Sequence, residues 1–231
     1  MPVAVITGGS RGFGRALAID LSKDGWHLII DGRDGAALAE VGELLNSVGG
    51  HSTVIAGDVS SARHRTALVR AAQRSGSLDL LVNNASTLGP TPLPRLEHLP
   101  LPELRQVYEV NVVAPLALIQ ESLPLLRRSR GTVVSLSSDA AVEGYEGWGG
   151  YGSSKAALDQ LHQVLAAEEP DLSVYQFDPG DMRTAMHQAA FPGEDISDRP
   201  EPESVVAPFR ALLASGAPNG RFRADAWAVR P

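Results

Sequence analysis

Short apolar runs recur along the chain, and each of them is bounded by Gly, Asp or Asn. Runs of this length between turn-forming residues are typical of buried strands. The segments that separate them are rich in Ala and Leu and repeat their apolar positions with the period of a helix. The pattern predicts strands at 3–6, 28–30, 53–55, 78–82, 132–136 and 174–177, and helices at 15–22, 36–45, 63–73, 104–126, 155–167 and 203–214.

Strands and helices alternate from one end of the chain to the other. Such alternation predicts parallel strands that are joined by right-handed helical crossovers. We therefore expect the α/β class: one Rossmann-like domain over residues 1–231, with a doubly wound parallel sheet of about seven strands and helices on both faces. In this fold the ligand crevice lies beyond the carboxyl ends of the strands.

One segment departs from this alternation. Residues 191–202 are rich in Pro, Gly, Asp and Glu, which predicts an irregular loop before the last helix. The loop is either a plain surface connection or a lid over the crevice, and the sequence favours neither.

Charge and composition exclude several classes of function. The formal net charge is -7, and a nucleic-acid partner would require clustered Lys and Arg that this chain lacks. The chain has no Cys, which excludes disulfides and thiolate chemistry, and its six His residues lack metal-ligand spacing, so we predict no metal. The apolar N-terminus is too short for a signal peptide, and no apolar stretch approaches the ~20 residues that cross a bilayer. We therefore expect a cytoplasmic protein with no membrane partner.

The first strand runs directly into a glycine-rich turn and then into a helix. Glycines at such a junction let the backbone approach a pyrophosphate, and the helix N-terminus directs unpaired N–H groups at the anion. Glycine turns also open many helices for steric reasons alone. The strand before, the helix after, and a second strand that ends about twenty residues on favour a dinucleotide cofactor. The candidate cofactor-binding residues are Thr7, Gly8, Ser10, Arg11, Gly12, Phe13 and Gly14.

The end of the second strand carries two residues with opposite implications for the cofactor. An acidic side chain there binds the ribose hydroxyls of NAD, whereas an arginine neutralises the 2'-phosphate of NADP. Asp31 favours NAD(H), and Arg33 favours NADP(H). We favour NADP(H), because Arg11 in the glycine turn is placed to reach the same phosphate, while NAD(H) stays an alternative.

Tyr151 and Lys155 are four residues apart at the start of a helical segment, which places the phenol and the ammonium on one face. A free tyrosine has a pKa near ~10, and a neighbouring ammonium is expected to lower it. Tyr151 is then able to protonate a carbonyl oxygen that accepts hydride, or to deprotonate an alcohol in the reverse direction. The same spacing also occurs by chance in exposed helices.

Further short motifs follow in a fixed order along the chain. They are Asp58-Val59, Asn83-Asn84-Ala85, Asn111, Ser138, and Pro179-Gly180 with Thr184, in addition to the glycine turn and the Tyr151/Lys155 pair. Together these motifs cover almost the whole chain, and they resemble the motifs of the short-chain dehydrogenase/reductase family.

The resemblance implies a role for each motif. Ser138 would hold the substrate oxygen, and Tyr151 would exchange the proton. Lys155 would bind the nicotinamide ribose and tune Tyr151, while Asn111 would anchor a water of a proton relay. The family also implies a small carbonyl or alcohol substrate, and a homodimer or homotetramer built through helices 104–126 and 155–167. Arg33, Asp58, Val59, Asn83, Asn84, Ala85, Tyr151, Lys155, Pro179, Gly180 and Thr184 would complete the cofactor site.

Asn111 also has a purely physical interpretation. It lies in the predicted helix 104–126, and Pro115, four residues later, has no N–H to donate to the Asn111 carbonyl. We hypothesise that this free carbonyl accepts from a water that bridges to Lys155, with Pro115 helping to open the helix. A proline kink without catalytic meaning is the alternative.

Three features depart from the family pattern. Ser86 replaces the glycine that usually follows the Asn-Asn-Ala motif, the segment after Thr184 is short, and residues 220–227 lack the usual glycine-rich tail. These regions usually shape the substrate pocket and the subunit contacts, so the resemblance does not define the substrate. Candidate pocket residues, each of which apolar packing also explains, are Trp148, Met182, Met186, His187 and Phe191.

Other functions share this kind of fold. A catalytically silent NADP(H)-binding sensor or assembly partner would have no need of the proton donor that Tyr151 supplies. An epimerase or dehydratase of the nucleotide-sugar class shares the Tyr/Lys spacing but needs an added C-terminal domain, and few residues follow Gly180. An NADP(H)-dependent oxidoreductase that acts on CH–OH and C=O groups therefore fits best.

Overall fold

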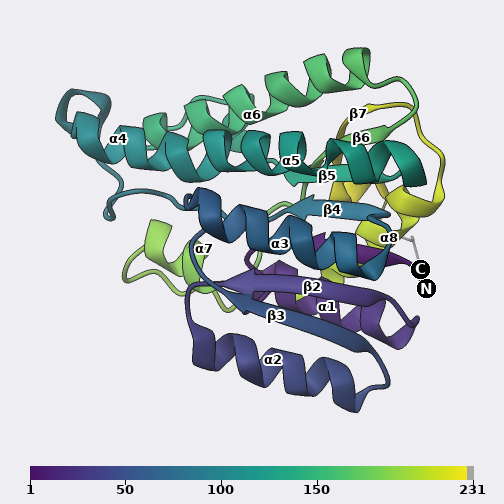
Figure 1. Ribbon diagram of the computed structural model, residues 1–231. Coiled ribbons are helices and arrows are strands. Elements are labelled where there is room, and N and C mark those ends of the chain that lie inside the picture. The colour runs from purple at the N-terminus through teal and green to yellow at the C-terminus, as the bar shows by residue number, and fades with distance from the viewer. Residues whose placement is uncertain (228–231) are drawn as a thin grey trace.

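Seven parallel strands form the centre of the computed structural model, which describes residues 1–227 (Figure 1). Their spatial order is β3-β2-β1-β4-β5-β6-β7, so the chain builds the sheet outward from β1 on one side and from β4 on the other. Each neighbouring pair in this order is parallel. The strands are β1 (Val3–Ile6), β2 (His27–Gly32), β3 (His51–Ala56), β4 (Leu80–Asn83), β5 (Thr132–Leu136), β6 (Ser173–Asp178) and β7 (Gly220–Arg223).

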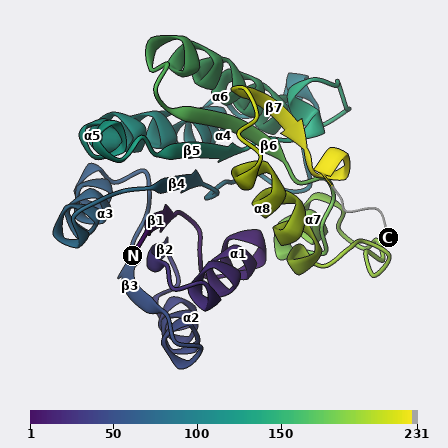
Figure 2. The ribbon, with the colours of Figure 1, turned by 90° about the vertical axis from the view of Figure 1, so that its right-hand side faces the viewer.

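Helices cover both faces of the sheet (Figure 2). The alternation of side chains along β1 builds a core on each face: Ala4 and Ile6 pack on one side, Val3 and Val5 on the other. α4 (Leu101–Tyr108) and α7 (Ala185–Ala190) lie beyond this layered body at one end (Figure 1). The first face carries α1 (Gly12–Lys23), α2 (Gly35–Ser47) and α8 (Val206–Ala214), and the second carries α3 (Ala62–Ser75), α5 (Ala114–Ser129) and α6 (Gly149–Glu168).

The predicted fold class and the six predicted strands are confirmed. The sequence pattern does not delimit β7 or α7, which are four and six residues long. It also starts the fifth predicted helix at residue 155, whereas α6 begins at Gly149, so Tyr151 lies in the first turn of this helix. Where the sequence predicts a loop over 191–202, the chain forms an irregular connection that ends at the short 3-10 helix Pro202–Val205, which leads into α8. Its role as a lid stays a prediction.

The helix predicted at 104–126 is longer than expected and is interrupted. One π-helical turn, Glu109–Val113, joins α4 to α5. Pro115, the second residue of α5, has no N–H to continue the ordinary ladder. The continuous run Leu101–Ser129 is long and apolar enough to cross a membrane, so the expectation that no stretch approaches that length is wrong. Half of its most apolar window is buried within the fold, and the run contacts α3 and α6.

Candidate active site and cofactor cradle

The carboxyl ends of β1 and β4 lie side by side where the strand order reverses, which is the point at which doubly wound sheets form a ligand crevice. The segments that follow these two strands are fastened to each other. The Thr7 hydroxyl accepts hydrogen bonds from the backbone N–H groups of Asn84 and Ala85, both at 3.0 Å. In return the Asn84 amide donates to the carbonyls of Thr7 and Gly8 at 2.8 and 3.1 Å. The polar groups of Thr7 and Asn84 therefore shape the glycine turn.

The glycine turn leads into α1, whose N-terminus is open. Arg11 is the N-cap residue, and its side chain makes no capping hydrogen bond. Unpaired N–H groups and the helix dipole at such an end favour an anion. Gly14 allows the close packing behind the turn, because a Cβ there would lie 2.5 Å from the Asn84 amide nitrogen and 2.6 Å from the Gly8 carbonyl. This backbone cradle fits the pyrophosphate of a dinucleotide.

The segment after β6 lies against the same turn. A Cβ on Gly12, which has a φ of 55°, would lie 3.6 Å from the Thr184 methyl group. The Thr184 hydroxyl itself caps α7 by accepting from the His187 N–H at 3.1 Å. Gly180, preceded by Pro179, takes the left-handed conformation with a φ of 71° and turns the chain from β6 toward α7. The structure thus brings this predicted segment to the cradle.

Several predicted cofactor residues have buried side chains, among them Phe13, Asn83 and Val59. Phe13 packs in the core against two other phenylalanines, stacked on Phe177 and edge-to-face with Phe209. The Asn83 amide donates to Ser135 at 3.2 Å between the sheet and α6. Val59 is 9% exposed, and Arg65 holds its carbonyl at 2.7 Å. Because Phe13 and Asn83 direct their side chains inward, any contact that they make with a cofactor comes from their backbone.

Asp31 does not face the crevice. It is 1% exposed, and both carboxylate oxygens are bound within the protein. Oδ1 accepts from the Gly8 N–H at 2.6 Å, and Oδ2 accepts from the His64 ring at 2.8 Å. The interpretation of Asp31 as the residue that binds a ribose is therefore wrong, because its carboxylate orients the glycine turn instead. The last residue of β2 is Gly32, and a Cβ there would lie 2.8 Å from the Ser10 hydroxyl.

Basic side chains gather at the adenosine end of the cradle. The Asp58 carboxylate accepts from the Ser60 N–H and hydroxyl, both at 2.8 Å. Burial opposes the charged form of Asp58, but these bonds and the nearby Arg33 guanidinium together lower its pKa. The Arg11 side chain is 67% exposed and lies 3.7 Å from Asp34, the residue after Arg33. The two arginines predicted for this end are thus on the same side of the turn.

Ser138, Tyr151 and Lys155 come together between β5 and α6, as the motifs predict. Ser138 lies two residues beyond the end of β5, and Lys155 follows Tyr151 by one turn on the same face of α6. The Lys155 ammonium lies 5.4 Å from the centroid of the Tyr151 ring and donates to the Leu136 carbonyl at 2.7 Å. The phenol and the ammonium are both buried.

The pKa values of this pair differ from the expectation. Burial raises the pKa of Tyr151, and the Ser138 and Ser86 hydroxyls oppose this only in part. Burial also lowers the pKa of Lys155 to about 8, with the Asp159 carboxylate acting in the opposite direction. The expected net lowering of the phenol pKa is therefore wrong for this structure, because desolvation of the phenol outweighs the groups that favour its phenolate.

Asn111 lies in the π-helical turn and is 1% exposed. Its Oδ1 accepts from the Thr87 N–H at 2.9 Å and from the Ser86 hydroxyl at 3.1 Å. Its Nδ2 donates to the Thr87 carbonyl at 2.9 Å and to the Ser154 hydroxyl at 3.0 Å, and that hydroxyl donates to the Tyr151 carbonyl at 2.6 Å. The Asn111 side chain thus connects the segment after β4 to α6, and Ser86 is part of this connection. The water at its backbone carbonyl stays a prediction.

Aromatic side chains form a wall beside the α6 pair. The Trp148 ring lies 5.7 Å from the tyrosine ring and 5.9 Å from the Phe191 ring, which lies 4.9 Å from the His187 ring. Met186 packs in the same cluster. Met182, the fifth candidate pocket residue, packs against the main core on the α1 face instead.

Sequence reasoning missed three charged residues behind the α6 pair: Asp159, Asp178 and Arg221. Asp159 follows Lys155 by four residues, and this spacing was the available signal. The sequence carries no such signal for Asp178 and Arg221, because these residues come from neighbouring strands that only the folded sheet brings together.

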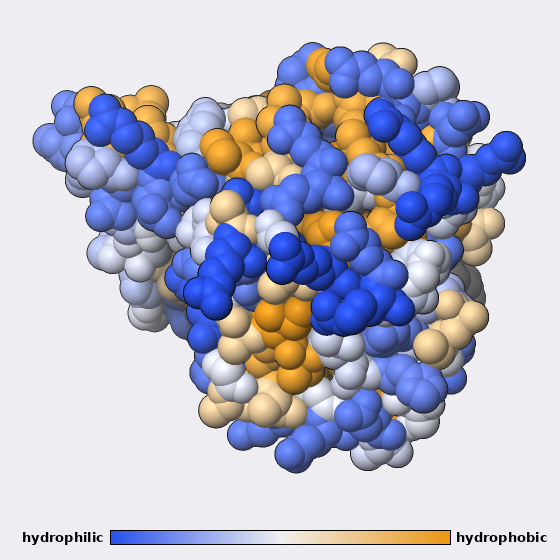
Figure 3. All heavy atoms as spheres, in the orientation of Figure 1, coloured by the Kyte–Doolittle hydropathy of each residue, from blue (hydrophilic) through white to orange (hydrophobic). Residues whose placement is uncertain are grey.

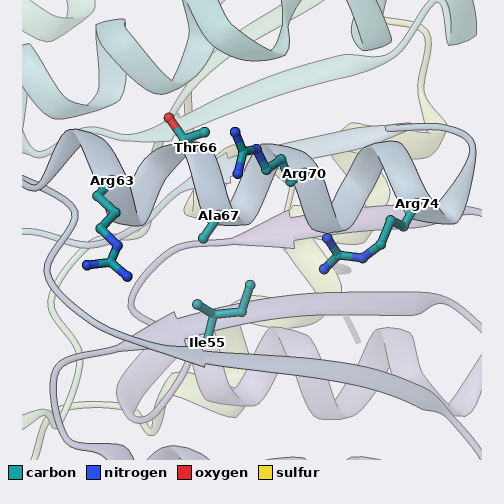
Figure 4. Close-up of a pocket in the computed structure, with 6 residues that line it drawn as sticks. All are labelled: Ile55, Arg63, Thr66, Ala67, Arg70 and Arg74. Atoms are coloured by element: carbon teal, nitrogen blue, oxygen red, sulfur yellow. The ribbon is translucent and has the colours of Figure 1, made fainter.

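A separate cavity of about 410 Å³ lies between α3 and β3 (Figure 4). Ile55 and Ala67 face each other across it, while Arg63, Arg70 and Arg74 extend from α3 along its length. None of the residues of the predicted motifs lines this cavity, so it is not the candidate site. Within residues 1–227, no group of three His, Asp or Glu side chains is arranged to hold a metal ion.

Known proteins share these sequence motifs and this fold. The family model described as short chain dehydrogenase matches residues 2–195. The sepiapterin reductase of Mus musculus is 35% identical over 222 residues, which cover 90% of this chain and 84% of the mouse protein. The rhamnolipids biosynthesis 3-oxoacyl-[acyl-carrier-protein] reductase of Pseudomonas aeruginosa is 36% identical over 173 residues, which cover 72% of this chain and 66% of that protein.

Solved structures agree with the family match. A putative short chain dehydrogenase from Pseudomonas syringae has a TM-score of 0.91 at 33% identity, covering 96% of this chain and 94% of that chain. A putative short chain dehydrogenase from Shigella flexneri, complexed with NADP, has a TM-score of 0.90 at 29% identity, covering 97% of both chains. The chain therefore belongs to the short-chain dehydrogenase family.

Proposed function

We propose that this chain is an NADP(H)-dependent oxidoreductase that moves hydride between the nicotinamide and a small carbonyl or alcohol, with Tyr151 as proton donor or acceptor. The observation that carries the proposal is one continuous set of contacts. Asn84 holds the glycine turn, Ser86 bonds Asn111, and Asn111 reaches α6 through Ser154. The dinucleotide cradle and the proton-donor pair are therefore held in one rigid arrangement.

The protonation state of the pair favours reduction at neutral pH. The cofactor supplies the hydride when it is bound in its reduced form. Because burial raises the pKa of Tyr151, the phenol keeps its proton and can donate it to a carbonyl oxygen held by Ser138. The Lys155 ammonium adds a positive charge beside the ring, which stabilises the phenolate that forms as the proton leaves. Oxidation of an alcohol needs this phenolate at the outset and is expected at higher pH.

Three observations support NADP(H) over NAD(H). The Asp31 carboxylate is bound to Gly8 and His64, so no acidic side chain is available from the end of β2. Arg11 and Arg33 supply two guanidiniums on one side of the turn, which suits a 2'-phosphate. Short-chain dehydrogenases from Shigella flexneri and Escherichia coli with this fold were crystallised with NADP and NADPH.

The test is oxidation of NADPH and NADH by the purified protein, with Tyr151→Phe as the control. The substrate panel includes sepiapterin and 3-oxoacyl thioesters, because relatives carry the names of enzymes for these compounds, together with simple aldehydes, ketones and quinones. We expect turnover with NADPH and a loss of about 10²- to 10⁴-fold in kcat for Tyr151→Phe, the range for a positioned proton-transfer group. NADPH binding without turnover of any panel compound would support the silent sensor instead.

A further inference from the structure

A charged network lies directly behind the Tyr151/Lys155 pair. Asp159 is on α6, one turn beyond Lys155, and its Oδ2 accepts from the Ser137 hydroxyl at 2.6 Å. Arg221, on β7, lies with its Nε 3.3 Å from the same oxygen. Its Nη2 donates to Asp178 Oδ2 at 2.8 Å, so one guanidinium bridges two buried carboxylates.

The network also reaches the backbone of the site. The Arg221 Nη2 donates to the Ser138 carbonyl at 2.9 Å. Ser137, which precedes Ser138, is held by Asp159. Ser137 and Ser138, the two residues that follow β5, are thus fixed from behind by charged side chains of α6 and β7. A backbone segment held in this way keeps a hydroxyl in a constant position relative to the phenol.

The charges balance only when Lys155 is included. Asp159 and Asp178 carry two negative charges, and Arg221 carries one positive charge, so the Lys155 ammonium makes the sum zero. Asp159 Oδ1 is buried and has no hydrogen-bond partner, so one carboxylate oxygen is not neutralised by a donor. Burying a carboxylate costs free energy, and a buried ion pair adds little net stability. The better explanation of the two buried carboxylates is that they orient the neighbouring site residues and set the charge of Lys155.

Several elements packed around Lys155 contribute titratable or charged groups. Burial lowers the pKa of His162, one turn beyond Asp159, to about 4, so this ring is neutral at physiological pH. Burial raises the pKa of Asp159, but its contacts with Ser137, Arg221 and Lys155 favour the charged form. The full set is Tyr151, Asp159 and His162 from α6, Asp139 after β5, Asp178 from β6 and Arg221 from β7.

We propose that Asp159 and Arg221 are positioning residues for the reaction: Asp159 keeps buried Lys155 in its ammonium form, and Arg221 fixes both Asp159 and the Ser138 backbone. This inference rests on the proposed function of the Tyr151/Lys155 pair. Without the Asp159 charge, desolvation acts unopposed and the ammonium loses its proton at lower pH. The cation that assists proton release from the phenol is then lost within the working pH range.

Lys155 offers a direct measurement, because the chain contains only two lysines. Labelling with [ε-13C]lysine gives two NMR signals, and Lys23→Arg assigns them without touching the site. Lys23 is exposed at the end of α1 and serves as the reference in each spectrum. We expect Asp159→Asn to lower the pKa of Lys155 by about one unit, a tenfold change in proton affinity, while the pKa of Lys23 stays constant. Asp159→Glu keeps the charge and is expected to restore most of the shift.

Kinetics provides the second readout. In Asp159→Asn the alkaline limb of the kcat/KM profile for carbonyl reduction should move to lower pH by the same amount as the Lys155 pKa. In Arg221→Lys, which keeps the charge but loses the forked contact and adds a third lysine signal to the spectrum, kcat should fall while the Lys155 pKa and the KM for NADPH stay constant. In Asp159→Asn, an unchanged Lys155 pKa, or a kcat/KM that is lowered equally at all pH values, overturns the proposal.

Two provisions keep the test decisive. If Asp159→Asn does not fold, Ser137→Ala replaces it: this variant removes one donor that favours the Asp159 charge, so a smaller Lys155 shift in the same direction is expected. If the wild-type protein reduces no compound of the panel, the proposed function fails, but the NMR titration still decides whether Asp159 sets the charge of Lys155.

Discussion

At the scale of single residues, cofactor selection depends on the direction in which neighbouring side chains point. Side chains alternate along β2, so Asp31 points into the fold, where α3 supplies His64 as its partner. Gly32 then ends the strand without a side chain, and Arg33 is the first residue beyond it. We therefore propose that the guanidinium of Arg33 is the group from this strand end that meets the adenosine ribose.

Replacement of Arg33 by serine tests this assignment. Loss of a charge-assisted hydrogen bond of about 1.5–3 kcal/mol should raise the KM for NADPH about 10- to 100-fold. The KM for NADH should stay constant, because NADH has no 2'-phosphate. Arg74→Ser, which removes an exposed arginine near the far end of α3, is the matched control and should change neither value. An equal rise in both KM values for Arg33→Ser would contradict the assignment.

At the scale of elements, the sequence predicted what is local and missed what depends on distant contacts. The period of the apolar positions located six strands, and the motif order located Ser138, Tyr151 and Lys155. β7 is four residues long, and its register on β6 depends on contacts between residues about 45 positions apart. Asp31 was misinterpreted for the same reason, since its partner His64 is 33 residues away. Burial of the phenol, which sets its pKa, likewise exists only in the folded chain.

The π-helical turn between α4 and α5 makes a prediction at this scale. Pro115 has no N–H for the Asn111 carbonyl, whereas alanine at this position can donate to it. If this carbonyl holds the water that bridges to Lys155, Pro115→Ala should lower kcat about tenfold, below the usual range for a proton-transfer group because the relay is indirect. Thermal unfolding should show no loss of stability, since alanine favours a helix more than proline does. An unchanged kcat in a folded Pro115→Ala protein would leave Pro115 as a structural kink only.

At the scale of the whole molecule, the long helix that contains this turn is not fully covered. Leu101–Ser129 has an apolar window of which half is buried within the chain. Val113 in this run and Val164 on the neighbouring α6 are 46% and 43% exposed. Apolar side chains also interrupt the charged surface over α5 and α6 (Figure 3). An apolar surface of this kind on adjacent helices is typical of a contact between protein chains.

We propose that a second copy of this chain covers the α5/α6 face, which gives a homodimer or a homotetramer. Val164→Asp should then convert the oligomer to a monomer, because a carboxylate buried in an apolar interface has no partner that offsets its desolvation. Size-exclusion chromatography with light scattering measures the mass directly. Val48→Asp is the matched control. Val48 is an exposed valine at the end of α2, on the opposite face of the sheet, so this substitution should leave the oligomer intact. A wild-type protein that is monomeric at micromolar concentration, or an oligomer that survives Val164→Asp, would show that this face is not the interface.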